Sequence, residues 1–370
     1  MEIPFTNLRA QFDAIREEIS SAIEASINSF QYIRGSSVTQ FEEAFAHLSG
    51  FNHCIATGNC TDSLFIIQKC LGLMPGDEVI TPAFSWISSA ETISLCHATP
   101  VFVDVDPIYY TIDPALVEKA ITPKTKGVIV VHLYGQMGYV EELKQICAQH
   151  KLWMIEDCAQ AHLATCRNQP AGGFGSAGAF SFYPTKNLGA YGDAGCVVTN
   201  DDLLAERLRR FSNHGALIKD DHTLIGMNSR MDSIQASILL AKLTHLPTWT
   251  EQRRSNARIY NERLLTEPNV ILPRERVGTS HNFHIYAIRA KKRNSLMDFL
   301  AKHGIQTMIH YPSALPNVAA YHHSGTSHSD FPISNTLEKE ILSLPIYPEL
   351  SLDNIDYICD TIRTFYRSHD

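Results

Sequence analysis

Short, almost entirely apolar segments alternate with helix-forming stretches through roughly the first two hundred residues of this chain. Seven of them have the length and composition of buried strands: Cys54–Ala56, Glu78–Thr81, Val101–Val105, Gly127–His132, Trp153–Glu156, Ala179–Phe182 and Cys196–Thr199. Helical patterns lie between them, for example Ser63–Leu71 and Val140–Gln149. Strands of a parallel sheet are apolar throughout, because helices cover both faces of the sheet. The sequence therefore predicts an α/β fold with a mostly parallel seven-stranded sheet and helices on both faces.

The length of 370 residues is enough for two domains. We expect residues 1–245 to form a large α/β domain that opens with one amphipathic helix over Leu8–Ile27, where apolar residues recur every three or four positions. Residues 246–370 are expected to form a smaller C-terminal α+β domain with a strand at Thr307–His310. A long helical stretch near the boundary is broken at about Pro247.

Charge and cysteine content exclude several classes of protein. The 31 Lys and Arg residues are scattered and are outnumbered by 39 Asp and Glu residues, which gives a net charge of −8. A nucleic-acid or anionic-membrane partner would need a basic face, so we expect neither. The sequence has no run apolar enough for a membrane span and no signal peptide at residues 1–7, so we expect a cytoplasmic protein. The nine cysteines lack paired spacing, which argues against a disulfide scaffold or a metal site.

Ligands of a parallel α/β fold bind beyond the carboxyl ends of the strands, and three segments of the chain fall there. The first, Ala56–Asp62, is a turn of small residues that opens a helix and offers backbone N–H groups to a phosphate. Many strand–helix turns share this composition. The second, Trp153–Gln160, places Asp157 at the end of an apolar strand. Asp157 either caps a following helix or faces a pyridine nitrogen and keeps that nitrogen protonated.

The third segment, Ser181–Gly195, is a glycine-rich loop that carries Lys186 between two apolar strands. A lone lysine is usually a solvated surface charge, and at its ordinary pKa of about 10.4 it is almost fully protonated at neutral pH. Burial in such a loop would instead favour the neutral, nucleophilic amine. The position of Lys186 therefore makes it a candidate nucleophile.

In their order and spacing, the three segments resemble the fold-type I pyridoxal-phosphate (PLP) enzymes, and specifically the nucleotide-sugar aminotransferases of the DegT/DnrJ/StrS type. The resemblance runs from Ile3–Phe5 to Leu344–Pro348, over essentially the whole chain, and Ser181–Gly195 is its most specific part. It implies a PLP-dependent transaminase that forms a homodimer with shared active sites.

Carried over residue by residue, the resemblance implies that Lys186 holds PLP covalently and that Asp157 pairs with the pyridinium nitrogen. Gln160 would lie near the ring hydroxyl. Trp86 would stack on the ring, unless Trp86 is a core aromatic and Phe84 takes that place. The other implied cofactor contacts are Cys60, Thr61 and Ser181 at the phosphate, and Asn228 at the phosphate of the neighbouring subunit. Many relatives have Gly or Ser at position 60, where a backbone N–H would serve equally.

Around the lysine, the chain resembles the branch of the family that aminates 3-keto sugars. Tyr183 stands where enzymes that aminate C4 often have His, and Gly192–Asp193 stands where they have Gly-Glu. In the 3-keto branch Tyr183 and the pair His310–Tyr311 border the hexose, with Lys219 nearby. Alternatively, His310 is a core histidine at a strand end and Lys219 is a solvated surface charge.

The resemblance implies transfer of an amino group from L-glutamate to the 3-keto carbon of a nucleotide-linked sugar. We expect dTDP-3-keto-6-deoxyhexose, because relatives that handle uronic acids more often carry Phe where this chain has Tyr183. A UDP-linked 3-keto-N-acetylhexosaminuronic acid is the alternative, with Lys219 supplying the cation, and C4 amination is another. PLP-dependent sugar dehydratases have His in place of Lys186. A non-catalytic PLP-binding regulator predicts a DNA-binding motif or a basic surface, and the sequence shows neither.

Overall fold

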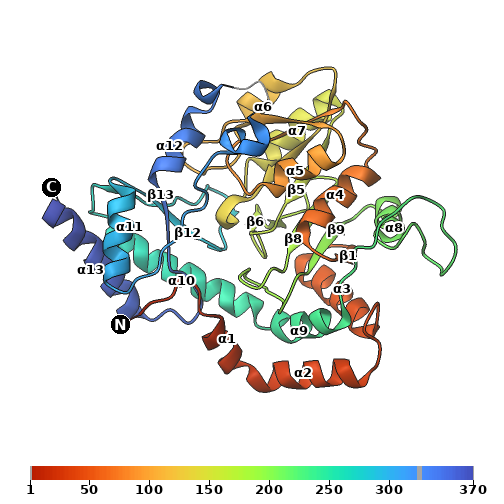
Figure 1. The fold of residues 1–370 in the computed structure, drawn as a ribbon, viewed down its shortest axis with the longest axis horizontal. Helices are drawn as coiled ribbons and strands as arrows, with labels where there is room; N and C mark the ends of the chain where they lie inside the picture. Colours follow the sequence, from red (N-terminus) through yellow and green to blue (C-terminus); the bar gives the residue numbers. More distant parts are fainter. Residues whose placement is uncertain (1, 323–326, 370) are drawn as a thin grey trace.

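The computed structural model describes residues 2–322 and 327–369, and a seven-stranded sheet with the order β1-β9-β8-β5-β4-β2-β3 lies at its centre (Figure 1). Its strands are β1 (His53–Thr57), β2 (Glu78–Pro82), β3 (Thr99–Val103), β4 (Thr125–Val131), β5 (Trp153–Asp157), β8 (Ala177–Ser181) and β9 (Gly195–Thr199). β9 runs antiparallel to β1 and β8, and the other neighbouring strands are parallel. The predicted α/β fold with a mostly parallel seven-stranded sheet is confirmed.

Helices cover both faces of this sheet, as its apolar strands require. One face packs against α3 (Ser36–Ser49), α6 (Pro114–Ala120), α7 (Val140–His150) and α9 (Ser233–Leu243). The other face packs against α4 (Cys60–Cys70), α5 (Ser88–Leu95) and α8 (Asp202–Phe211). Phe45 of α3 meets Phe180 and Phe182 edge to face, with ring centroids 5.2 and 5.3 Å apart. These contacts fix the end of β8, where the lysine loop begins.

The single helix predicted over Leu8–Ile27 is wrong, because the structure has α1 (Leu8–Ala14) and α2 (Arg16–Asn28) with a break at Ile15. Ile15 leaves the helical conformation, with φ of −128° and ψ of 26°. The apolar periodicity continues through the break because Ile15 and Ile19 both pack on the hydrophobic cluster that contains Trp249.

A separate hydrophobic core lies toward the C-terminus. Its three-stranded sheet consists of β10 (Val270–Ile271), β12 (Tyr286–Ala290) and β13 (Ile341–Leu344), and its helices are α10 (Leu246–Leu264), α11 (Arg293–Lys302) and α13 (Leu352–His369). Ile3 joins this core and pairs with Ile305, so the chain begins beside its own C-terminal part. The domain boundary at residues 245 and 246 stays a prediction.

The remaining elements are small. They are the three-stranded sheet of β6 (Thr165–Cys166), β7 (Gln169–Pro170) and β11 (Thr279–Ser280), the helix α12 (Pro332–Glu340), and the 3-10 turns η1 (Leu133–Gly135), η2 (Leu315–Asn317), η3 (Ala319–Tyr321) and η4 (His328–Asp330). Among the described residues, no helix is long and apolar enough to cross a membrane. All nine cysteines fall in the described part and are free.

The strand predicted at Thr307–His310 is also wrong. Within this segment only Met308 pairs, in an isolated bridge to Ser343 of β13. The chain then leaves the sheet and carries His310 and Tyr311 to the wall of a cavity.

Candidate active site

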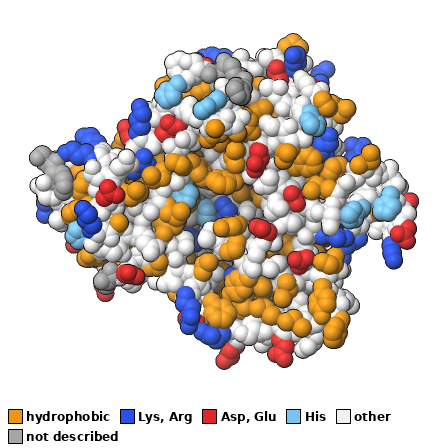
Figure 2. Space-filling view, in the orientation of Figure 1, with side chains coloured by type: hydrophobic (Ala, Val, Ile, Leu, Met, Phe, Trp, Pro, Cys, Tyr) orange, Lys and Arg blue, Asp and Glu red, His pale blue; other side chains and the backbone are white. Residues whose placement is uncertain are grey.

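A cavity of about 680 Å³ opens at the carboxyl edge of the central sheet, and it is the hollow near the middle of the face drawn in Figure 2. Its walls come from the ends of β5 and β8, the start of α4, the lysine loop and residues 284–285 and 310–311. It brings together most of the predicted site residues: Cys60, Thr61, Trp86, Asp157, Gln160, Ser181, Tyr183, Lys186, His310 and Tyr311. Lys219 and Asn228 are exposed and are not among its lining residues.

The loop that carries Lys186 joins β8 to β9 and is held at several points. The backbone N–H of Ala190 donates to the carbonyl of Phe182 at 2.8 Å, which closes the loop. Lys242 of α9, fully buried, donates from Nζ to the carbonyl of Gly189 at 2.7 Å. Sequence reasoning missed this second lysine, because nothing in the pattern of α9 distinguishes it from a surface residue. The anchored loop leaves Lys186 at the cavity wall.

Lys186 and Asp157 face the same cavity from different elements. Desolvation lowers the pKa of Lys186, and the charge of Asp157 opposes that shift. Burial raises the pKa of Asp157, whereas a hydrogen bond from the N–H of Ala159 at 3.0 Å and the positive charges of Lys186 and His132 lower it. Turns rather than a helix follow β5, so Asp157 is not a helix cap. The arrangement places an amine whose pKa is lowered and a carboxylate whose pKa is raised on the wall of one cavity.

The start of α4 forms a second part of the cavity wall. Asn59 caps this helix with its side chain, and Cys60 and Thr61 occupy its first turn. The hydroxyl of Thr61 is 2.8 Å from the hydroxyl of Ser88. A Cβ at Gly195 would lie 2.7 Å from the backbone nitrogen of Cys60, so only glycine allows β9 to approach so closely. Backbone N–H groups at a helix start, here inside the cavity, suit an anion such as a phosphate.

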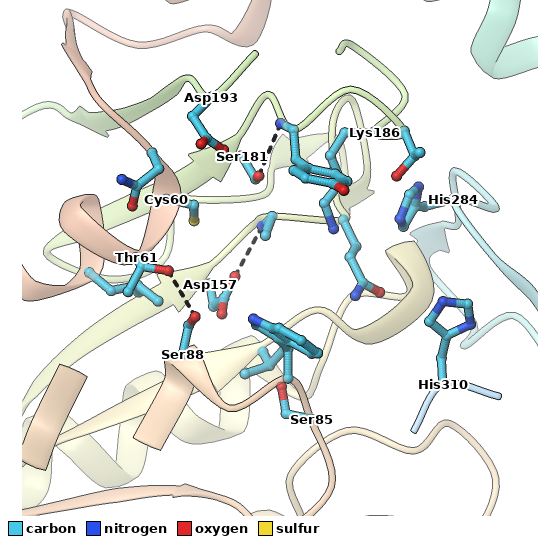
Figure 3. A pocket seen from close by; sticks show the side chains of 18 of the residues that line it. Cys60, Thr61, Ser85, Ser88, Asp157, Ser181, Lys186, Asp193, His284 and His310 are labelled. Carbon is cyan, nitrogen blue, oxygen red and sulfur yellow. Dashed lines mark hydrogen bonds between the residues drawn. The ribbon is translucent and has the colours of Figure 1, made fainter. Parts of the chain in front are cut away.

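Two histidines form the wall on the side away from Asp157 (Figure 3). His284 Nδ1 is 3.1 Å from Oδ1 of Asn187, and His310 Nδ1 is 2.9 Å from the hydroxyl of Ser343. Burial, aided by the charge of Lys186, lowers the pKa of His310 to about 4 and that of His284 well below its usual value. Both rings are therefore neutral near pH 7. The sequence offered no signal for His284, which stands in an apolar stretch that reads as strand.

Aromatic side chains complete the site. Trp86 lines the cavity, and its ring centroid is 5.7 Å from that of Tyr311. Phe84, the competing candidate, is fully buried in the core. Gln160 donates from Nε2 to the hydroxyl of Tyr311 at 3.0 Å. The structure thus leaves Trp86, and not Phe84, available to a flat ligand.

A desolvated amine, a buried carboxylate, a helix start and an exposed indole in one cavity suit a phosphorylated pyridine. Residues 13–363 match the DegT/DnrJ/EryC1/StrS aminotransferase family. The chain belongs to this family. It is a PLP-dependent aminotransferase, and the donor set of the cavity fits that cofactor.

Relatives match this aminotransferase over nearly their whole length. A pleiotropic regulatory protein of Geobacillus stearothermophilus is 43% identical over 99% of both chains. The UDP-N-acetyl-3-dehydro-α-D-glucosamine 3-aminotransferase of Acidithiobacillus ferrooxidans is 39% identical, over 98% of this chain and 97% of its own. The dTDP-3-amino-3,4,6-trideoxy-α-D-glucose transaminase of Streptomyces venezuelae is 37% identical, over 98% and 95%. The crystal structure of S. venezuelae DesV with a ketimine intermediate superposes with a TM-score of 0.96 at 37% identity, over 98% of both chains.

The buried histidines predict how the stability of this aminotransferase depends on pH. Burial lowers the pKa of His162 and of His281 to about 3, against about 6.5 in an unfolded chain. Below pH 6.5 the unfolded state binds more protons than the folded state, so the free energy of unfolding decreases as the pH is lowered. Each histidine costs about 1.4 kcal/mol per pH unit between about pH 6.5 and 3.

Urea unfolding at a fixed protein concentration, at pH 7.5 and at pH 5, measures this dependence. His162, which lies among Phe45, Phe180 and Phe182, can be tested by His162→Leu. We expect the loss of stability between these two pH values to be about 2 kcal/mol smaller in this variant, because His162 binds a proton only in the unfolded state below about pH 6.5. An unchanged loss would contradict the prediction.

Proposed function

We propose that the enzyme transfers the amino group of L-glutamate to the 3-keto carbon of a nucleotide-linked sugar, and that this sugar is dTDP-3-keto-6-deoxyhexose. The names of the S. venezuelae and A. ferrooxidans relatives both place an amino group at C3 of a nucleotide sugar. The G. stearothermophilus relative is named as a regulatory protein, and that name applies to that protein. In the present chain, a desolvated amine and a buried carboxylate in one cavity favour a catalytic role over a regulatory one.

The uncharged wall of the cavity is the observation that carries the choice of sugar. Tyr183, the neutral His310 and Tyr311 line it, and Lys186 is the only Lys or Arg among its described lining residues. A uronate would need a further cation to offset the desolvation of its carboxylate, whereas a 6-deoxy sugar needs only an apolar surface for its methyl group. Lys219, in the segment that projects beyond α8 (Figure 1), is the cation that the UDP-uronate alternative would require.

Lys186 and Asp157 carry the proposed chemistry. When bound, PLP supplies an electron sink for the carbon that gains or loses the amino group. The ε-amine of Lys186 would hold the cofactor in the resting enzyme and, once released, would carry a proton to and from that carbon. The carboxylate of Asp157 would accept a hydrogen bond from the protonated ring nitrogen. We assign the other cofactor contacts to the indole of Trp86, the amide of Gln160 near the ring hydroxyl, and a phosphate site made by Cys60, Thr61 and Ser181.

We further propose a homodimer in which Asn228 reaches the phosphate of the partner's site. Asn228 is exposed, yet its neighbour Ser229 is anchored at the start of α4, with its hydroxyl 3.0 Å from the nitrogen of Gly58 and 2.6 Å from a carboxylate oxygen of Asp62. Hydrophobic side chains gather over the lower part of the molecule around α1, α2 and α9 (Figure 2), and Phe30 beside them is 79% exposed. Exposed apolar surface of this kind suits a second copy of the chain.

The substrate can be tested by offering glutamate with either dTDP-3-keto-6-deoxyhexose or the UDP-linked 3-keto-N-acetylhexosaminuronate. We expect kcat/KM to be at least roughly tenfold higher for the dTDP sugar, because no side chain on the wall neutralises a uronate. Mass spectrometry of the product locates the new amino group. A preference for the uronate, or amination at C4, would contradict the proposal.

The roles of Lys186 and Asp157 can be separated by two variants. In the wild-type enzyme, borohydride should fix the cofactor to the peptide that contains Lys186, and Lys186→Ala should lose both this labelling and turnover. Asp157→Asn should keep the labelling but lose roughly a hundredfold or more in kcat, because the ring nitrogen loses its charged partner. Label on another lysine, or near-normal turnover of Asp157→Asn, would refute the assignments.

Mixing two inactive variants tests the shared site. Lys186→Ala supplies an intact Asn228 to a subunit with Asn228→Asp, whose Lys186 is intact. Random pairing should therefore restore about a quarter of the sites. Each variant mixed with wild-type chains serves as the control for subunit exchange. A fully active monomer in sedimentation, or exchange without recovery of activity, would exclude the shared site.

A further inference from the structure

Tyr134 lies behind the cavity wall and completes a closed set of hydrogen bonds with the lining residues Gln160, His310 and Tyr311. Its backbone N–H donates to Oε1 of Gln160 at 2.6 Å, and Nε2 of Gln160 donates to the hydroxyl of Tyr311 at 3.0 Å. The hydroxyl of Tyr134 donates in turn to the carbonyl of His310, the residue before Tyr311. One residue of the large sheet's edge thus contacts both a proposed cofactor ligand and the backbone of the loop that borders the sugar.

These hydrogen bonds determine which atoms of Gln160 and Tyr311 donate and which accept. A backbone N–H can only donate, so the amide of Gln160 must present its oxygen to Tyr134 and its NH₂ to the cavity side. One N–H of that NH₂ goes to the oxygen of Tyr311, which leaves the phenolic proton of Tyr311 free to donate. Burial raises the pKa of Tyr311, so the phenol keeps this proton. Gln160 and Tyr311 therefore both offer donors, which suit acceptor oxygens on a ligand.

Tyr134 has a backbone conformation that a packing role alone does not require. It lies in η1 with φ of 61°, in the left-handed region that bulky side chains rarely adopt. Its side chain is 4% exposed and packs against Tyr110, with ring centroids 6.4 Å apart. The left-handed conformation lets the N–H of Tyr134 face Gln160 while its ring reaches the loop at His310. Unfavourable backbone of this kind persists where the surrounding contacts demand it, often at functional sites.

We propose that Tyr134 is a positioning residue for the sugar substrate. By anchoring the backbone of His310, its hydroxyl holds Tyr311 where the phenol can donate to the substrate. The proposal rests on the proposed function for its substrate, but the anchoring of the loop does not. Tyr134→Phe removes the anchor and leaves the backbone bond to Gln160 in place.

Tyr260→Phe is a matched control. Tyr260 is fully buried in the C-terminal core, and its hydroxyl donates to the carbonyl of Pro345 at 2.9 Å. Both substitutions therefore delete one phenol-to-carbonyl hydrogen bond and keep the aromatic ring. A merely structural role for Tyr134 would make the two variants alike.

The first measurement is amide hydrogen exchange of residues 308–314 in the cofactor-loaded enzyme without sugar. We expect exchange there to be faster in Tyr134→Phe and unchanged in Tyr260→Phe. Wild-type exchange in Tyr134→Phe, or the same change in both variants, would overturn the proposal. This comparison decides on the anchor even if the enzyme aminates none of the 3-keto sugars offered, an outcome that would instead refute the proposed function.

The second measurement separates the two halves of the reaction. In Tyr134→Phe the absorption of the bound cofactor and the rate of its conversion by glutamate should match the wild type. The KM for the keto sugar should rise roughly five- to tenfold, the loss expected for about one hydrogen bond, with little change in kcat. Tyr260→Phe should leave all four quantities unchanged. An equal loss in both half-reactions, or an unchanged KM in Tyr134→Phe, would show that Tyr134 does not position the sugar.

Discussion

The removal of two opposite charges from water is the constraint on which this site depends. Lys186 and Asp157 lose hydration in the same cavity, and each partly offsets the cost to the other. Asp157 can stay in place because the preceding residue, Glu156, fixes the end of β5 from the opposite face of the sheet. The buried carboxylate of Glu156 is 2.9 Å from Nε2 of His132 and accepts backbone N–H groups of Gly172, Phe174 and Gly175. Fixed dipoles and a histidine thus replace the water that Glu156 lost.

Asn282 joins the two walls of the cavity. Its side-chain nitrogen donates to the carbonyls of Gln160 and His162, both at 2.9 Å, and its side-chain oxygen accepts from the N–H of His284 at 2.9 Å. A Cβ at Gly135 would lie 1.7 Å from that oxygen, so glycine is required where the segment that contains Gly135 passes Asn282. These bonds hold His284, from the C-terminal core, against the segment that follows Asp157. The neutral wall and the charged wall are therefore one hydrogen-bonded unit.

Local sequence was sufficient to predict the sheet and the residues at its carboxyl edge. Asp157 is the last residue of the apolar strand β5 and Lys186 lies in the loop that follows β8, so their position at the site follows from the topology of a parallel sheet. His284 and Tyr134 were not predictable, because their importance arises from contacts with residues far away in the chain. The strand predicted at Thr307–His310 failed for the same reason, since this chain segment leaves the sheet after one bridge to Ser343. Periodicity reports the environment of a segment but not which distant segment it meets.

The cavity lies between the edge of the central sheet and segments that are attached to the C-terminal sheet, and this position couples ligand binding to the cohesion of the molecule. A ligand that touches Asp157 on one side and His310, which is bonded to Ser343 of β13, on the other binds only when the two sheets are correctly placed. By thermodynamic linkage, the free energy of its binding then also opposes separation of the sheets. Such a ligand acts as a reversible crosslink, and its concentration sets how firmly the C-terminal core is held to the sheet.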